Sequence, residues 1–367
     1  MAVEPLNNRL EQIQRYMDHQ KLDAVIITSP RHVYYLTGFN SDPHERFLGL
    51  VIPHGDEPVL ITPELDRQAA SQASSVQKIV THTDTQNPYE VLKSTLPSSL
   101  RQVGIEKGHL TVNRYEQLKA AIGAEVFLDM EALLQEMRSV KTSEEVQRIK
   151  HAIRLVEDVL REGLKKVQVG VTEIEIVAEL EYQMKKLGAQ GPSFETMVLA
   201  GEKSALPHGK PDHRPIKEGE FLLFDLGVYA DGYISDITRT FAVGRVTQRM
   251  ASMYEAVLAA NRAGIDATKP GVTFASIDQQ AREAIAERGY GEYFIHRLGH
   301  GMGLETHEYP SVHGENQDIA KTGNVFTIEP GVYIPEVGGV RIEDDVLVTD
   351  NGCEVLTTFP KELKIIG

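Results

Sequence analysis

The chain has 367 residues, of which 41% are hydrophobic and 25% charged, a composition typical of ordinary globular proteins. This length is sufficient for two domains with sizeable cores. The formal net charge of −15 argues against a nucleic acid or an anionic membrane as partner, because both are bound through basic surfaces. The single cysteine, Cys353, excludes an internal disulfide and makes a thiolate metal site improbable.

The N-terminal segment lacks the apolar run of a signal peptide, and no later stretch approaches membrane-spanning length. We therefore expect a cytoplasmic protein. Residues 1–135 alternate between short apolar runs and helix-periodic stretches, which predicts an α/β domain. The loop from Asn40 to Arg46 gathers ionisable side chains, and taken alone it is expected to be a solvated surface loop.

A capping-box pattern at Thr142 to Glu145 predicts the start of a long helix, so we place a second domain at residues 136–367. Within this domain, Gly170-Val-Thr172 and Gly271-Val-Thr273 each open a predicted helix after a longer one. Strands that carry carboxylates follow in both cases. The repetition predicts two related α+β halves, and binding sites often lie where such halves meet.

The stretch from Phe221 to Thr240 is the most informative part of the chain. An apolar run ends in Asp225, a turn signal follows at Asp231-Gly232, and the returning strand carries Asp236. The predicted hairpin brings the two carboxylates close together, where they repel each other unless a cation lies between them. A hydrogen-bonded pair of aspartates and a metal site both explain this hairpin.

A second dense stretch runs from His296 to Glu308 and contains three histidines among glycines. We expect Gly299, Gly301 and Gly303 to give the backbone unusual dihedral angles beside His300. Two later apolar strands also carry carboxylates. The candidate metal ligands are therefore Asp225, Asp236, His300, Glu329 and Glu343.

This oxygen-rich set with one imidazole suits two divalent cations bridged by carboxylates. It favours Mn²⁺ or Co²⁺, with Zn²⁺ next, over copper or iron–sulfur clusters. The positions and their surroundings resemble the pita-bread metallopeptidases, a family that includes methionine aminopeptidase, Xaa-Pro aminopeptidase and Xaa-Pro dipeptidase (prolidase). The resemblance covers essentially the whole chain, and Tyr34 to Asn40 is similar to a stretch of the creatinase-type N-terminal domain.

The resemblance implies an α+β fold in which a smaller α/β domain precedes a pita-bread domain with two pseudo-symmetric halves. All five family ligands are present, which argues against a metal-free binding protein or a creatinase-like hydrolase on the same fold. In the family, the metals activate a bridging water. The resemblance then makes Glu329 the group that moves the proton of this water to the leaving prolyl nitrogen.

Further family positions fall on His208, His296, His307 and Arg341. The resemblance implies that His307 stabilises the oxyanion and that His208 orients the substrate near the leaving nitrogen. His296 is expected to position the prolyl part. Arg341 is expected to orient Glu343 or Asp236.

Dipeptides and longer peptides remain alternative substrates. Some prolidases hold the substrate carboxylate with an arginine. This chain has Ser311 at that position, so its resemblance to those prolidases is weaker. A second type carries an Asp-x-His-Glu-Arg loop and an arginine before the metal histidine, and this chain has Arg46 and Arg297 there. We therefore expect an Xaa-Pro dipeptidase, with an Xaa-Pro aminopeptidase as the alternative. We also expect a homodimer in which Arg46 reaches the partner's site.

Overall fold

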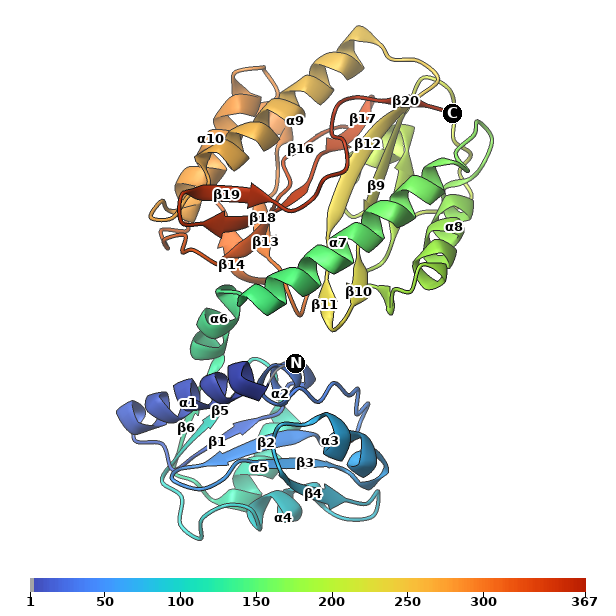
Figure 1. Ribbon diagram of the computed structural model, residues 1–367. Helices are drawn as coiled ribbons and strands as arrows, with labels where there is room; N and C mark the ends of the chain where they lie inside the picture. Colours follow the sequence, from blue (N-terminus) through green and yellow to red (C-terminus); the bar gives the residue numbers. More distant parts are fainter. Residues whose placement is uncertain (1–2) are drawn as a thin grey trace. The chain divides into compact units, whose positions relative to one another are not determined.

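The computed structural model describes residues 3–367, which form two compact units, Met1–Met137 and Arg138–Gly367 (Figure 1). Each unit has its own hydrophobic core. Among the helices in the described range, none combines the length and the apolar character needed to cross a membrane.

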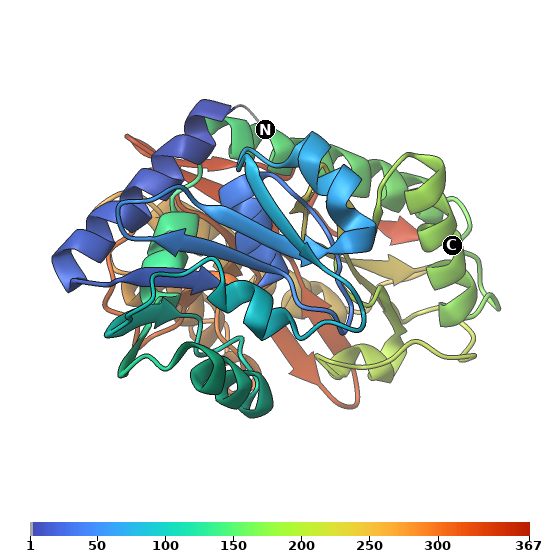
Figure 2. The same ribbon diagram turned by 90° about the horizontal axis from the view of Figure 1, so that it is seen from below.

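The first unit is built on a six-stranded mixed sheet with the strand order β4-β3-β2-β1-β5-β6 (Figure 2). The strands β1 and β2 pair antiparallel, whereas β1, β5 and β6 run parallel. The central strands are buried along their whole length, as expected for a sheet covered on both faces. The strands are β1 (Ala24–Ile27), β2 (Gly49–Pro53), β3 (Val59–Pro63), β4 (Lys78–His82), β5 (Gln102–Ile105) and β6 (Val126–Asp129).

Helices surround this sheet, and their ends follow local sequence signals. Helix α2 begins with a proline, whose fixed φ suits the first helical turn, and ends at Gly38 in the left-handed conformation. Helix α5 is capped by the hydroxyl of Thr111. The helices are α1 (Val3–Gln20), α2 (Pro30–Thr37), α3 (Arg67–Ala73), α4 (Pro88–Lys93), α5 (Val112–Ile122) and α6 (Glu131–Ser139), with the 3-10 turn η1 (Glu64–Asp66).

The second unit contains two helix pairs, each packed on its own set of strands (Figure 1). The first half comprises α7 (Ser143–Leu164), α8 (Glu173–Lys186), β7 (Gly191–Pro192), β8 (Met197–Ala200), η2 (Gly201–Ala205), β9 (Phe221–Leu226), β10 (Val228–Ala230), β11 (Tyr233–Ile234) and β12 (Ile237–Val243). The second comprises α9 (Gln248–Ala267), α10 (Phe274–Ala286), η3 (Gly291–Tyr293), β13 (Gly299–Gly301), β14 (Glu308–Val312), β15 (Val325–Ile328), β16 (Gly331–Ile334), β17 (Gly338–Arg341), β18 (Asp344–Thr349) and β19 (Gly352–Val355). The last strand, β20 (Ile365–Ile366), pairs with β12 of the first half.

The two halves repeat each other down to single hydrogen bonds, as the matching Gly-Val-Thr segments predict. Thr172 and Thr273 are both helix N-caps, of α8 and α10 respectively. Gly170 and Gly271 both have positive φ, 94° and 88°. Their amides donate to equivalent backbone carbonyls, those of Ile216 and Ala320. The duplicated architecture is the pita-bread fold.

The sheets of the second unit bring strands from distant parts of the sequence side by side. One has the order β20-β12-β9-β8, and another has the order β14-β13-β15-β18-β19. The predicted capping box is confirmed at α7, where Thr142 and Glu145 each accept a hydrogen bond from the other's backbone amide.

Candidate metal centre

The hairpin that carries the two aspartates forms as its sequence predicts. Asp231 and Gly232 both have positive φ, 52° and 79°, as a tight primed turn requires. Strand β9 pairs antiparallel with β12, so that Asp225 lies opposite Thr238. Asp236 directly precedes β12 and is buried, with 4% of its surface exposed.

His300 lies in the short strand β13 between two glycines, but the reason for the glycines differs from our expectation. Neither Gly299 nor Gly301 is among the residues with positive φ. A Cβ at Gly299 would lie 1.9 Å from the carbonyl oxygen of Thr327, and one at Gly301 would lie 2.3 Å from that of Tyr309. The glycines are needed because neighbouring backbone approaches the histidine strand closely.

The two glutamates occupy a break between paired strands. Strands β15 and β18 pair as far as Ile328 opposite Asp344, and β16 and β17 resume with Gly331 opposite Arg341. Glu329 and Pro330 lie in the gap on one side, and Ile342 and Glu343 on the other. The two glutamates therefore lie on opposite sides of the same break.

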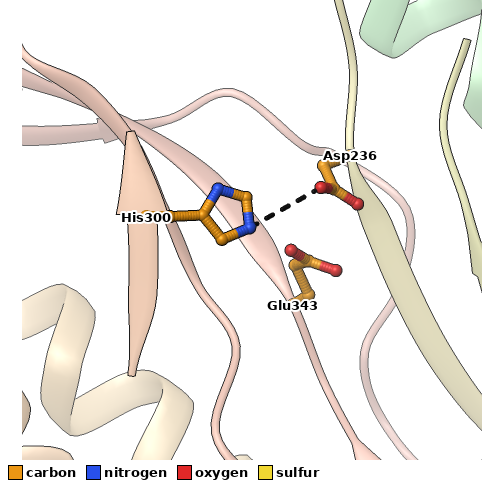
Figure 3. A group of neighbouring side chains, drawn as sticks. All are labelled: Asp236, His300 and Glu343. Atoms are coloured by element: carbon orange, nitrogen blue, oxygen red, sulfur yellow. Dashed lines mark ion pairs between the residues drawn. The ribbon is translucent and has the colours of Figure 1, made fainter. Parts of the chain in front are cut away.

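The structure brings three of the five predicted ligands into one buried group, Asp236, His300 and Glu343 (Figure 3). One potential ligand atom from each lies within 4.8 Å of the others. The Nε2 atom of His300 is 3.9 Å from Asp236 Oδ2 and 3.3 Å from Glu329 Oε1, so the fourth predicted ligand borders the group. These side chains come from both halves of the fold.

Asp225, the fifth predicted ligand, is held by Arg341, whose Nη2 donates to Asp225 Oδ2. We expected Arg341 to orient Glu343 or Asp236, and its direct partner in this group is Asp225. The arginine reaches Glu343 through Thr238: its Nε donates to the Thr238 hydroxyl at 3.1 Å, and that hydroxyl donates to Glu343 Oε2 at 2.7 Å. One buried guanidinium therefore orients carboxylates on two different strands.

The electrostatics of this group fit a cation site. Burial and the neighbouring charges of Glu343 and Asp225 raise the pKa of Asp236 well above its usual range. Burial, with the charges of Glu329 and Asp225, does the same to the pKa of Glu343. Burial raises the pKa of Glu329 to about 7. Carboxylates crowded in this way keep their charges only beside additional cations, and together with one imidazole they form a donor set suited to divalent metals.

His296 is tied to the protein through both ring nitrogens. Its Nδ1 lies 2.7 Å from the Arg297 carbonyl, which can only accept, so this nitrogen carries the proton. Its Nε2, 2.9 Å from the Tyr333 hydroxyl, therefore accepts from it. Burial lowers the pKa of His296 to about 4, so the ring is neutral at pH 7. Its ring also packs edge to face with Phe294, with centroids 5.1 Å apart.

Tyr333 is the residue of the site that sequence reasoning missed. Its hydroxyl accepts from Arg341 Nη1 at 2.9 Å while it donates to His296. A continuous chain of hydrogen bonds thus runs from His296 to Asp225. The only signal in the sequence is strand alternation, which places Tyr333 two residues after Gly331 on the same face as the start of β16.

The other histidines lie next to this group. The rings of His300 and His307 meet edge to face, with centroids 4.3 Å apart. Burial lowers the pKa of His300 to about 3, and partial burial lowers that of His307. His208 is exposed in the segment after η2, and its charge contributes to lowering the pKa values of His296 and His307. His307 therefore contacts His300, and His208 lies near His296 and His307.

The two predicted substrate-binding arginines lie in different units. Arg297 donates to the hydroxyl of Ser311 at 3.0 Å and lies beside a cavity of about 520 Å³ that His296 also lines. Arg46 belongs to the first unit, where its guanidinium donates to Asp84 at 2.8 Å. Its predicted part in substrate binding stays a prediction.

Comparison with known proteins agrees with this geometry. Residues 147–350 match the metallopeptidase family M24, and residues 9–140 match the creatinase/prolidase N-terminal domain. A Bacillus subtilis protein described as "Putative dipeptidase YkvY" is 43% identical over 362 residues, which cover 98% of this chain and all of the relative.

Two solved structures are similar along nearly their whole length. An Xaa-Pro dipeptidase from Bacillus anthracis superposes with a TM-score of 0.93 at 35% identity, covering 98% of this chain and 100% of that one. An X-Pro aminopeptidase from Thermotoga maritima gives 0.87 at 33% identity, covering 94% and 98%. The chain therefore belongs to metallopeptidase family M24 and carries a creatinase/prolidase N-terminal domain ahead of its pita-bread domain.

Proposed function

We propose that this protein is a dinuclear-metal hydrolase that cleaves Xaa-Pro peptide bonds, preferably in dipeptides. The observation that carries the proposal is the buried group of Asp236, His300 and Glu343, whose ligand atoms lie within 4.8 Å of one another. Glu329 borders this group and Asp225 is coupled to it electrostatically, so five donors are available for two cations. The similarity to an Xaa-Pro dipeptidase supports the substrate class.

The metals are proposed to be Mn²⁺ or Co²⁺, with Zn²⁺ as the next candidate, because four carboxylates and one imidazole offer hard and borderline donors without a thiolate. When bound, the cations supply Lewis acidity that lowers the pKa of a water to near neutrality and polarises the scissile carbonyl. Arg341 keeps Asp225 oriented for this role, and Thr238 does the same for Glu343.

The side chains around the cluster supply the remaining chemistry. Glu329, which borders the group 3.3 Å from His300 Nε2, is proposed to take a proton from water and deliver it to the prolyl nitrogen as the peptide bond breaks. His307 packs edge to face on His300 and is proposed to stabilise the oxyanion. His208 is proposed to orient the substrate near the leaving nitrogen, and His296 offers its ring to the prolyl part.

Preference for dipeptides requires a cation that pairs with the prolyl carboxylate. Arg297 lies beside His296 and borders the cavity of about 520 Å³, a volume within the range of small-ligand sites. Arg46 is the second candidate, acting in a homodimer on the partner's site. The alternative function is an Xaa-Pro aminopeptidase for longer peptides, and the similarity to an X-Pro aminopeptidase at 33% identity favours it.

Kinetics with matched peptides test the proposal. The Mn²⁺-loaded protein is assayed with Ala-Pro, Ala-Pro-Ala and Ala-Ala. We expect kcat/KM for Ala-Pro to exceed that for the tripeptide at least tenfold, since a charge-assisted pair with the carboxylate is lost in the longer peptide. A preference for Ala-Pro-Ala would establish the aminopeptidase alternative. Equal hydrolysis of Ala-Ala would contradict the proposed requirement for proline.

A further inference from the structure

The break between paired strands that releases Glu329 and Glu343 keeps one backbone hydrogen bond, from the Ile342 amide to the Pro330 carbonyl at 3.4 Å. Pro330, inside the break, has no N–H to donate. The residues that precede the two glutamates, Ile328 and Ile342, both present carbonyl groups at this point, and both residues are fully buried. A buried carbonyl that lacks a donor is costly, so an additional donor at this point helps to fix the position of these backbones.

The donor is the side chain of Asn261, which lies in α9 and has none of its surface exposed. Its Nδ2 donates to the Ile328 carbonyl at 3.2 Å and to the Ile342 carbonyl at 3.4 Å. One amide group therefore connects the two backbones immediately before two candidate metal ligands. This bridge spans the break at the place where Pro330 cannot donate to the opposite strand.

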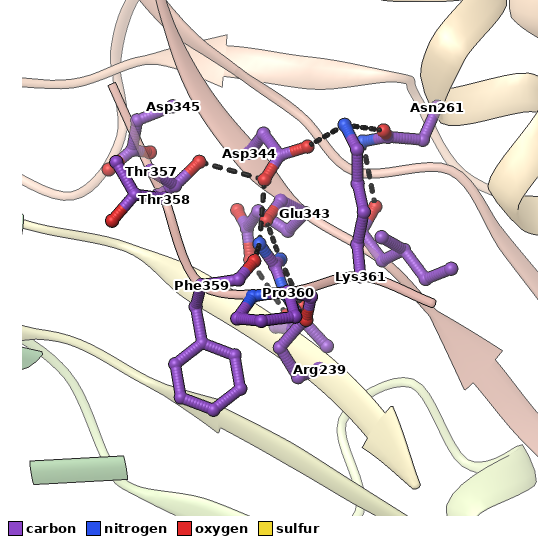
Figure 4. A network of polar contacts seen from close by, with 12 residues as sticks. Arg239, Asn261, Glu343, Asp344, Asp345, Thr357, Thr358, Phe359, Pro360 and Lys361 are labelled. Carbon is purple, nitrogen blue, oxygen red and sulfur yellow. Dashed lines mark hydrogen bonds and ion pairs between the residues drawn. The ribbon is translucent and has the colours of Figure 1, made fainter. Parts of the chain in front are cut away.

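The orientation of this amide is fixed from its other side. Lys361 donates from Nζ to Asn261 Oδ1 at 2.7 Å, so the oxygen faces the ammonium and the nitrogen faces the carbonyls (Figure 4). The same ammonium is 2.6 Å from Asp344 Oδ2. Asp344 Oδ1 in turn accepts a hydrogen bond from Arg239 Nη2 at 2.8 Å, and Arg239 also donates to the Glu343 carbonyl. Arg239 and Asp344 are buried, whereas Lys361 is partly exposed, and the network reaches Glu343 through its backbone carbonyl.

We propose that Asn261 is a positioning residue for the metal centre: its amide sets the separation between the backbones of Glu329 and Glu343. Lys361, from the C-terminal segment, holds the amide in the donating orientation. The inference rests on the proposed metal site, because the separation matters only if both glutamates bind the same pair of ions. Partners that orient metal ligands in this way commonly affect metal affinity by 10- to 100-fold.

Three variants test the inference by Mn²⁺ titration calorimetry on the metal-free full-length protein. Asn261→Leu removes the amide at similar size, and Asn261→Asp retains an oxygen for Lys361 but cannot donate to the carbonyls. Val257→Ala, a cavity variant at a fully buried position of the same helix, is the control for general loss of stability. We expect both Asn261 variants to weaken Mn²⁺ binding at least tenfold and Val257→Ala to change it less than threefold.

The outcomes separate the inference from the proposed function. If wild type binds no Mn²⁺, the proposed metal centre fails; if wild type binds and Asn261→Leu binds equally well, only the inference fails. Retained affinity in Asn261→Asp would overturn the bridging role, and equal losses in Val257→Ala would reduce Asn261 to a general stabilising residue. If the Asn261 variants do not fold, Lys361→Met, at a partly exposed position, is used; it should weaken Mn²⁺ binding at least threefold, and unchanged affinity would overturn the inference.

Discussion

A buried carboxylate next to His307 offers a quantitative test of how the catalytic loop is held. Glu308 Oε1 accepts from the backbone amides of Leu304 and Glu305 at 2.6 and 2.9 Å, and also from Arg138. Lys141 Nζ lies 3.4 Å from Oε2. The exposed side-chain fractions of Glu308 and Lys141 are 3% and 1%, so these charges face each other away from water.

Glu308→Gln keeps the shape of the side chain but leaves Arg138 and Lys141 without the negative charge of the carboxylate. Breaking one partner out of a buried ion pair costs roughly 3–5 kcal/mol. Arg138 retains its ion pair with Glu305 at 2.7 Å, so we expect the free energy of unfolding to fall by about 3 kcal/mol, at the lower end of this range. For a domain of this size, each kcal/mol lowers Tm by about 2–4 °C, so we expect a drop of roughly 6–12 °C at pH 7. The carboxamide also positions the loop less firmly, so kcat should fall while metal content stays unchanged.

The pH dependence of this effect follows from the pKa of Glu308, which its cationic neighbours Lys141 and Arg138 hold at about 2 against burial. The pKa of Glu308 in the native state is below its value in the unfolded state. Its contribution to the free energy of unfolding is therefore complete above about pH 4.5 and is lost as the pH falls towards 2. Lys141 is desolvated, and its own pKa is lowered. The Tm difference between wild type and Glu308→Gln should therefore be constant from pH 6 to 8 and shrink on acidification.

Calorimetric unfolding of both metal-free proteins between pH 3 and 8 provides the measurement. Glu162→Gln, which breaks an exposed helical pair with Lys165, is the matched control and should leave Tm within about 1 °C. A difference below about 2 °C at pH 7 for Glu308→Gln, or one that grows towards low pH, would refute the reasoning.

Four further substitutions test the roles assigned to other residues. Asp236→Asn removes a bridging charge and should release one or both metals with near-complete loss of hydrolysis; full occupancy with normal turnover, measured by elemental analysis and kinetics, would rule Asp236 out as a ligand. His307→Ala should lower kcat about 10²- to 10³-fold with unchanged metal content, as for loss of one oxyanion donor; lost metal would make it a ligand. Arg46→Ala should raise KM for Ala-Pro about tenfold and barely change it for Ala-Pro-Ala, and Arg297→Ala is compared in parallel. Unchanged dipeptide kinetics in Arg46→Ala would mean that the loop from Asn40 to Arg46 is only a solvated surface feature.

Features of the fold that depend on local sequence were predictable. The Asp231-Gly232 turn forms because both residues tolerate positive φ, and the helices after Thr172 and Thr273 begin where their hydroxyls cap the first turn. Apolar runs that end in a carboxylate were also informative, because burying a charge requires compensation. Carboxylates inside apolar strands carried the same signal, and two of them, Asp236 and Glu343, lie with His300 in one buried group.

Features that depend on the packing of distant segments were not predictable. Four carboxylates were available to Arg341, and only the fold selects Asp225, 116 residues earlier in the chain. Asn261 looks like any polar residue of a long helix, yet it donates to carbonyls 67 and 81 residues away. The glycines beside His300 illustrate the same limit, because the backbone that crowds them comes from other strands.

The most direct test of the central claim is a titration of metal-free protein with Mn²⁺ while the initial rate of Ala-Pro hydrolysis is followed. We expect no hydrolysis in the metal-free protein and a rate that rises with added metal and reaches a plateau at two equivalents per chain, because both ions are held by shared carboxylates. Full hydrolysis without metal, or a failure of the fully loaded protein to cleave Ala-Pro, would contradict the account.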